Sequence, residues 1–426
     1  MMYLFGLFCL LFAGVSCKID HFQPEQVHLS FGNNLTEMFV TWTTYSQTSS
    51  SIVEYGIDGL ILKKTGESVK FVDGGVEKRT IYIHKVKLTH LTPNSTYLYH
   101  CGSNEGWSSL FSFHTPPDDI NWSPRIALFG DMGSFNAQSL SRLQQEAQRG
   151  LYDVIIHIGD FAYDMDTDEG RVGDEFMRQI ESIAAYVPYM TVPGNHEEKY
   201  NFSHYRARFT MPGDNEGLYY SFNFGPIHFI GISSEVYYYL NYGLKQMVKQ
   251  YDWLQNDLKE ATYPENRADR PWIITLGHRP MYCSNDDSDD CTFEKDILRV
   301  GLPILNWFGL EDLFYEKGVD MEIWAHEHSY ERTWPLYNNE VYNGSFDAPY
   351  TNPGAPVHII TGSAGCNEFV DKFINNPKPW SAFRSSDYGY TRLTAFNKTH
   401  LYLEQVSDDK EGAVIDWFWL IKTRTT

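Results

Sequence analysis

The sequence contains little basic charge, few cysteines and, past its first residues, no long hydrophobic run. Lys and Arg number 34 against 55 Asp and Glu, so the formal charge is −21 at pH 7. Nonspecific binding to nucleic acid or to an anionic membrane needs a basic surface, so this composition argues against both. No segment beyond the N-terminus is long and apolar enough to cross a membrane, and stable membrane insertion is not expected. Solenoid repeats, low-complexity tracts and paired CxxC zinc motifs are also absent from the sequence.

The one long apolar run lies at the N-terminus. Residues 1–17 are typical of a secretory signal, with an apolar core and small residues from Ala13 to Ser16. The basic residues that usually precede such a core are missing, so an uncleaved anchor stays an alternative. Sequons of the N-x-S/T type independently predict an exported glycoprotein, and they lie at Asn34, Asn94, Asn201, Asn343 and Asn397. We expect a secreted protein, or one in the lumen of a secretory or lysosomal compartment.

Four cysteines remain after residue 17. Cys283 and Cys291 flank an acidic loop that a disulfide bond would close in an oxidising compartment, and we predict this bond. The alternative is that both are free thiols. Cys101 and Cys366 would pair with each other, with other chains, or with nothing, and the sequence leaves these possibilities open.

The 426 residues allow two or three domains. Residues 18–118 alternate apolar and polar positions between turn signals, which predicts an all-β sandwich. After a Pro-rich linker the pattern changes to α/β, and it returns to strand-like segments in the tail. We divide the chain into 1–17 (signal), 18–118 (sandwich), 122–350 (catalytic domain) and 351–426 (C-terminal part of that domain). Expected helices are Gln138–Gln148, Asp174–Ala185, Lys245–Glu260 and Ile304–Lys317, the last ending at Gly318.

Five short apolar runs each stop at a tiny residue that a potential metal ligand follows. The junctions are Ile126–Asp131, Val154–Asp160, Tyr189–Asn195, Trp272–His278 and Met321–His326. Runs this short and β-rich are typical of buried strands in βαβ units. Ligands in such sheets bind beyond the carboxyl ends of the strands, where these polar residues fall. Five junctions that all carry Asp, Asn or His predict one metal-centred site.

The chemistry of these side chains favours particular metals. One carboxylate can bridge two cations, and hard oxygen donors mixed with imidazoles suit iron, manganese or zinc. Bound cations would also neutralise an anionic substrate in so acidic a protein. We interpret His157 as structural, because it lies in the body of its predicted strand, and Arg279, beside Pro280, as a surface or structural residue outside the site.

The blocks resemble the metal signature of the calcineurin-like metallophosphoesterase superfamily. Tyr163, three residues after Asp160, and Tyr330-Glu-Arg332 after the last histidine are similar to the purple acid phosphatases within it. The long segment before the first motif resembles the two-domain form found in animals and plants. The resemblance implies a fibronectin type III-like β-sandwich followed by a metallophosphoesterase α/β sandwich with mixed β-sheets.

Carried over to this sequence, the resemblance implies two metal ions. Iron(III) would be held by Asp131, Asp160, Tyr163 and His328, and a second, divalent metal (Zn, Fe or Mn) by Asp160 as the bridge, Asn195, His278 and His326. Charge counting agrees, because two carboxylates and a phenolate suit a trivalent ion, whereas a shared carboxylate, an amide and two imidazoles suit a divalent one. His196 would contact the phosphoryl group or protonate the leaving group.

The function expected is that of a secreted acid phosphatase that activates a water or hydroxide to hydrolyse small phosphate monoesters. Two departures from the family pattern stand out. The loop Tyr282–Cys291 has no histidine, which keeps a phosphodiesterase or nucleotide pyrophosphatase as an alternative, and Ala325 replaces a glycine. A catalytically reduced extracellular binding protein is the other alternative, although no ligand position is lost. The oligomeric state stays open.

Overall fold

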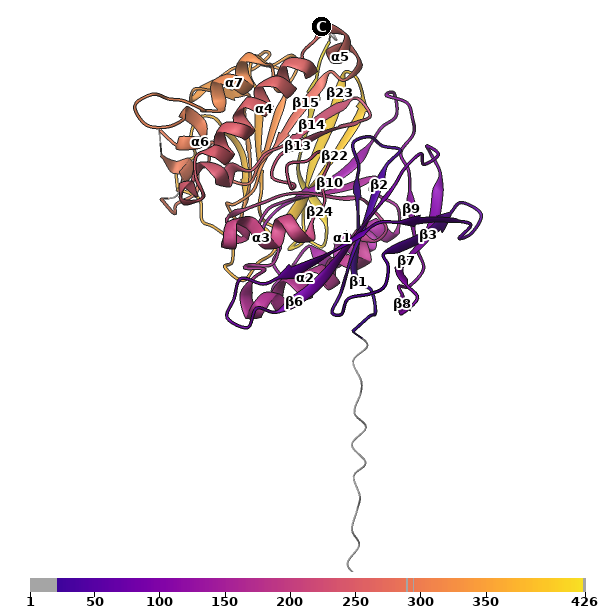
Figure 1. The fold of residues 1–426 in the computed structure, drawn as a ribbon. Coiled ribbons are helices and arrows are strands. Elements are labelled where there is room, and N and C mark those ends of the chain that lie inside the picture. Colours follow the sequence, from indigo (N-terminus) through magenta and orange to yellow (C-terminus); the bar gives the residue numbers. More distant parts are fainter. Residues whose placement is uncertain (1–20, 289, 294, 424–426) are drawn as a thin grey trace, which may run out of the picture.

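The protein is described here by a computed structural model that covers residues 21–423 except residues 289 and 294 (Figure 1). The predicted signal, residues 1–17, lies outside the described residues. Within the described part of the chain, no helix combines the length and apolar character needed to span a membrane.

The N-terminal part of the chain forms two facing β-sheets. One has the strand order β1-β2-β6-β5 and the other β4-β3-β7-β8, with β9 paired to β7. Side chains largely alternate between buried and partly exposed along β6, as the sequence pattern predicts for a strand with one face on a core. The strands are β1 (Glu25–Phe31), β2 (Met38–Thr44), β3 (Ile52–Gly56), β4 (Leu62–Thr65), β5 (Glu67–Val72), β6 (Thr80–Leu88), β7 (Thr96–Ser103), β8 (Gly106–Trp107) and β9 (Phe111–His114). The predicted sandwich is confirmed.

Two larger sheets follow, and we call them the six-stranded and the seven-stranded sheet. Their strand orders are β12-β11-β10-β22-β23-β24 and β13-β14-β15-β16-β20-β17-β21. Both mix parallel and antiparallel pairs: β10 is parallel to β11 and antiparallel to β22, and β16 is parallel to β20, which is antiparallel to β17. The strands are β10 (Arg125–Phe129), β11 (Val154–Ile158), β12 (Tyr189–Val192), β13 (Tyr220–Phe224), β14 (Ile227–Gly231), β15 (Trp272–Leu276), β16 (Met321–Trp324), β17 (Tyr330–Thr333), β20 (Val357–Thr361), β21 (Ser381–Ser385), β22 (Gly389–Asn397), β23 (His400–Ser407) and β24 (Ala413–Ile421), with a separate hairpin of β18 (Leu336–Tyr337) and β19 (Glu340–Val341).

Helices lie on the outside of these sheets (Figure 1). They are α1 (Leu140–Gln148), α2 (Thr167–Ala184), α3 (Lys199–Arg208), α4 (Lys245–Ala261), α5 (Pro264–Asp269), α6 (Ile297–Val300) and α7 (Glu311–Glu316), with short 3₁₀ turns η1 (Asn195–Glu197), η2 (Ser234–Tyr237), η3 (Leu240–Tyr242) and η4 (Asp290–Thr292). The five apolar runs identified from the sequence are β10, β11, β12, β15 and β16, and four of these five strands are buried along their whole length. The predicted α/β sandwich with mixed sheets is therefore confirmed, whereas the domain boundaries at 118 and 350 stay predictions.

One helix prediction is wrong in its first half. The expected helix Ile304–Lys317 is present only as α7, which starts at Glu311. Ile304, Asn306 and Phe308 all have positive φ, which a right-handed helix excludes. The predicted end is confirmed, because Gly318 has φ 63° and its N–H donates to the carbonyl of Tyr315.

The sandwich packs on α2 through polar contacts, and a buried ion pair joins α2 to α3. The N–H of Val27 on β1 donates to Glu181 Oε2 at 2.8 Å, and the Tyr99 hydroxyl donates to the carbonyl of Ala185 at 2.7 Å. Arg208 on α3 pairs with Asp174 on α2 at 2.8 Å with both side chains 1% exposed. These contacts hold the two helices that follow the site-bearing strands β11 and β12.

The predicted disulfide bond is confirmed. Cys283 and Cys291 are bonded, with their Cα atoms 5.3 Å apart. Cys101 and Cys366 are both buried and are not disulfide-bonded.

Candidate metal centre

The predicted site residues come together where strands of the two large sheets end. Asp131, Asp160 and Asn195 follow β10, β11 and β12 of the six-stranded sheet. His278 and His326 follow β15 and β16 of the seven-stranded sheet. The sheets meet here, because the N–H of Gly130 donates to the carbonyl of Thr361 at the end of β20 at 2.9 Å. The predicted ligands therefore come from both sheets.

One group of side chains centres on Tyr163. Its hydroxyl oxygen lies 2.7 Å from Nε2 of His328 and 3.3 Å from Oδ1 of Asp131. Nε2 of His328 lies 3.7 Å from the same carboxylate oxygen. A phenol, a carboxylate and an imidazole thus converge within the span of one coordination sphere.

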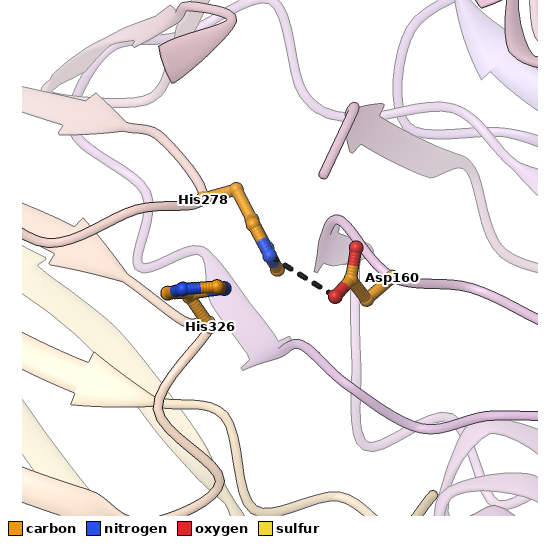
Figure 2. A group of neighbouring side chains, drawn as sticks. All are labelled: Asp160, His278 and His326. Atoms are coloured by element: carbon orange, nitrogen blue, oxygen red, sulfur yellow. Dashed lines mark ion pairs between the residues drawn. The ribbon is translucent and has the colours of Figure 1, made fainter. Parts of the chain in front are cut away.

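A second group centres on His278. Its Nε2 lies 3.2 Å from Asp160 Oδ2 and 3.1 Å from Asn195 Oδ1. Figure 2 shows the side chains of His278, His326 and Asp160 converging, with the ion pair between His278 and Asp160 dashed. One ligand atom from each of these three lies within 4.8 Å of the others. Asp131 joins the groups, because its Oδ1 is 4.0 Å from His278 Nε2 and its Oδ2 accepts the N–H of His326 at 3.0 Å.

His196 lies at the rim of the two groups. Its backbone N–H donates to Asp160 Oδ1 at 3.0 Å, and its ring lies 4.4 Å from the Tyr163 ring. Nδ1 is 2.9 Å from Asp164 Oδ1, while Nε2 is 3.9 Å from Asp160 and 3.8 Å from Glu368. The side chain is 19% exposed, so it can reach both the buried donors and solvent.

Several of these side chains project from residues with a left-handed backbone conformation. Asp131, Asp160, Tyr163 and His326 have φ between 53° and 70°, a left-handed region that costs non-glycine residues free energy. Strained backbone of this kind clusters at functional sites. Ala325 itself does not have positive φ, and its methyl group fills the space over Gly130, which explains why alanine is accepted there.

Glu197 fixes the ends of two site-bearing strands, and the sequence analysis missed it. Its buried carboxylate accepts the N–H groups of Asp160 at 2.8 Å, Phe161 at 3.0 Å and Gly194 at 2.9 Å. Burial and the nearby Asp160 raise the pKa of Glu197 to about 7. Its place directly after Gly194-Asn195-His196 was the available signal.

Electrostatics favour cations at this site. Burial raises the pKa of Asp131 and Tyr163 well above their usual ranges. Asp160 is also buried, but the neighbouring His278 and His196 hold the pKa of its carboxyl well below its ordinary value. Burial would lower the pKa of His278, yet Asp160 and Asp131 outweigh it and raise that pKa to about 10. A bound cation would displace the protons of Tyr163 and His278, because metal ligands bind in their deprotonated forms.

Three further side chains lie at or near this site. Arg279, interpreted from the sequence as a surface or structural residue outside the site, is 12% exposed and pairs with Glu235, as a structural residue would, but its Nη1 lies 3.1 Å from Nε2 of the predicted ligand His326. Cys366 Sγ lies 3.4 Å from Nδ1 of His328. His157 is buried, with Nδ1 2.7 Å from the Tyr189 hydroxyl and its ring among Phe129 and Phe161, as expected for a structural histidine.

Three family models match most of the chain. The calcineurin-like phosphoesterase model matches residues 124–330, the purple acid phosphatase N-terminal domain matches 24–115, and the iron/zinc purple acid phosphatase-like protein C matches 355–417. The chain belongs to the purple acid phosphatase family. Acid phosphatase type 7 of Danio rerio is 59% identical, covering 98% of this chain and 94% of that protein. Acid phosphatase type 7 of Homo sapiens is 54% identical, covering 94% of this chain and 91% of that protein.

A solved purple acid phosphatase has the same architecture. The enzyme isolated from yellow lupin (Lupinus luteus) seeds superposes with a TM-score of 0.79 at 27% identity, covering 94% of this chain and 74% of that one. The family resemblance read from the sequence is thus confirmed, and the chain is a phosphatase with the metallophosphoesterase fold. Membership in the purple acid phosphatases implies a binuclear metal centre that contains iron.

Proposed function

We propose that the chain hydrolyses small phosphate monoesters as a secreted acid phosphatase, using seven side chains to hold two metals. Iron(III) is assigned to Asp131, Asp160, Tyr163 and His328. A divalent metal is assigned to Asp160, Asn195, His278 and His326. The observation that carries the proposal is the convergence of these donors into two adjacent groups at the ends of strands from both sheets.

The donor sets fit the metals assigned to them. The Tyr163 group contains a phenol and carboxylates, which give a trivalent ion the anionic ligands it prefers. The His278 group is mainly neutral, with an amide and imidazoles, and accommodates zinc, iron or manganese. When bound, such a pair of ions supplies a hydroxide at neutral or acidic pH and neutralises phosphate charge.

His196 is proposed to hold and deliver a proton. Burial lowers its pKa, but Asp160 and Asp164 outweigh that effect and raise it to about 9. Asp164 holds Nδ1 of the ring, which places His196 to hydrogen-bond a phosphoryl oxygen or, as the imidazolium, to protonate the leaving alkoxide. General-acid catalysis of this kind contributes roughly 10²–10⁴-fold. We expect His196→Gln to lower kcat within that range.

Export and glycosylation are part of the same proposal. Asn34, Asn94, Asn343 and Asn397 are exposed, as carbohydrate attachment requires. Asn201 is half-buried and its side-chain oxygen accepts from Gln246 at 2.9 Å, so it should be the least occupied sequon. The shift in mass of the secreted protein after enzymatic removal of N-glycans, peptide by peptide, tests this order.

The deciding experiment is p-nitrophenyl phosphate hydrolysis from pH 4 to 8 by the purified secreted protein. Asp160→Asn removes the bridging carboxylate, and Asp252→Asn, an exposed aspartate on α4, is the control with the same change of charge. We expect turnover in acid that Asp160→Asn abolishes and Asp252→Asn leaves intact. Equal turnover in Asp160→Asn and wild type would refute the assignment. A parallel diester substrate separates a phosphatase from the phosphodiesterase alternative.

A further inference from the structure

The loop closed by the Cys283–Cys291 disulfide lies against the predicted ligands of the second metal. Asp290, directly before Cys291, forms an ion pair with the guanidinium of Arg279. Oδ2 of Asp290 also lies 3.9 Å from Nε2 of His326. The loop has no histidine, and its Asp290 brings a carboxylate to this face of the site.

Arg279 connects this loop to two metal ligands. It follows His278 in the chain, and its Nη1 lies 3.1 Å from Nε2 of His326. Its Nε donates to the fully buried Glu235 at 2.9 Å, and its guanidinium carbon lies 4.7 Å from the centre of the Tyr238 ring. The Arg279 side chain is 12% exposed. Its charge is therefore balanced by two carboxylates, and its position is fixed from several sides.

The three predicted imidazole ligands differ in how their rings are held. Nδ1 of His278 lies 2.8 Å from the carbonyl oxygen of Ile158, and Nδ1 of His328 lies 2.8 Å from that of Phe369. Nε2 of His326 instead faces the side chains of Arg279 and Asp290. A metal-binding histidine usually has its second nitrogen fixed by a carbonyl or a carboxylate, which sets the ring orientation. For His326 the group within hydrogen-bond distance is the Arg279 guanidinium, which the disulfide-closed loop holds through Asp290.

We propose that Asp290 is a positioning residue for the second metal: it fixes Arg279 and the ring of His326, and the disulfide fixes Asp290. The inference rests on the proposed function, because it requires His326 to be a ligand. Neutralising Asp290 leaves Arg279 with one carboxylate partner fewer and lets the His326 ring turn. The second metal is then held less firmly, while the ligands around Tyr163 keep their own contacts.

The test follows each metal separately in the metal-loaded protein. Wild type and Asp290→Asn are exposed to a chelator, and iron and the divalent metal that remain are measured by elemental analysis over time. We expect Asp290→Asn to lose the divalent metal about 10–100-fold faster, the usual effect of removing an outer-shell partner. Iron content and the visible absorption of the Tyr163–iron pair should not change. Asp286→Asn, an exposed aspartate of the same loop, is the matched control and should behave as wild type.

Two outcomes would overturn the inference: equal loss of the divalent metal from Asp290→Asn and wild type, or equally accelerated loss of both metals. His326→Ala separates this from failure of the proposed function. If His326→Ala retains both metals, the ligand assignment is wrong and the inference falls with it. If only His326→Ala loses the divalent metal, the assignment stands and the role of Asp290 is refuted. The double variant Cys283→Ser/Cys291→Ser should lose the divalent metal as fast as Asp290→Asn. If the double variant does not fold, Asp290→Asn alone is the test, because it keeps the disulfide.

Discussion

Two fully buried histidines, one in the sandwich and one in the catalytic domain, have opposite electrostatics. His84 on β6 is flanked by the hydroxyls of Thr44 at 2.9 Å and Ser51 at 2.8 Å and stacks on Trp42, and burial lowers its pKa to about 4. His278 lies beside Asp160 and Asp131, which raise its pKa to about 10 against the effect of burial. Both side chains are 0% exposed. Burial alone therefore favours the neutral form of a histidine, whereas buried carboxylates beside it favour the charged form.

The largest expected difference between the two histidines is in turnover. His278→Gln removes a predicted ligand and should lower phosphatase activity about 10³-fold, because a bound metal supplies several kcal/mol of charge stabilisation. His84→Gln should leave kcat unchanged and lower the free energy of unfolding by about 1–3 kcal/mol. Steady-state assays and urea titrations of both variants check this. Similar activity losses in the two variants would remove the distinction.

Metal removal should sharpen the same comparison. A ligand present at a thousand times its dissociation constant stabilises the folded state by about 4 kcal/mol. We expect chelation to lower the unfolding free energy of wild type and of His84→Gln by the same amount, and that of His278→Gln by much less. Urea unfolding with and without chelator provides the measurement. A chelation effect of full size in His278→Gln would show that this histidine holds no metal.

The free energy of unfolding should depend on pH in part through His84, the histidine of the sandwich. The pKa of His84 is about 4 in the folded protein, below the ordinary 6.5, so between these values the unfolded chain binds a proton that the folded chain does not. Its contribution is present above pH 6.5 and is lost as pH falls toward 4, by up to about 3 kcal/mol. His84→Gln should flatten the decline of the unfolding free energy over this range, and an unchanged slope would contradict the assignment.

The smallest effect should come from Ala325→Gly, next to His326. Ala325 has no positive φ, so glycine gains no backbone relief and only raises the entropy of the unfolded chain, by roughly 0.5–1 kcal/mol. Activity should be unchanged. Gly130→Ala is the contrasting variant, since a methyl group there would collide with Ala325 and with the carbonyl of Ile158. Thermal melts of the two variants rank them, and a loss of stability well above about 1 kcal/mol in Ala325→Gly would imply that the buried methyl group contributes packing beyond the backbone entropy.

The strand ends of the catalytic domain could be predicted because two signals coincided. Short runs rich in β-branched residues, such as Val154–Ile158, favour buried strands, and the polar residue after each run marks the carboxyl end of the strand. The sandwich was predictable from alternation alone, as in β6. Both signals are local, so a single sequence carries them.

Features that depend on distant segments could not be predicted in this way. The contact of Arg279 with His326 joins residues 47 positions apart, and Arg beside Pro carries no local sign of it. The left-handed turns at Ile304, Asn306 and Phe308 break a segment whose composition favours a helix. The role of Glu197 could not be predicted for a similar reason, because the three N–H groups that it accepts lie at the ends of two different strands.

The left-handed backbone at Asp131, Asp160 and His326 has a consequence for how such a site persists. Glycine would adopt each of these conformations without steric cost, so the residues that make the site are worse for the fold than the simplest replacement. Selection for stability alone would therefore erode the site one glycine at a time. Aspartate and histidine at these turns are the residues that selection for the proposed metal site would retain.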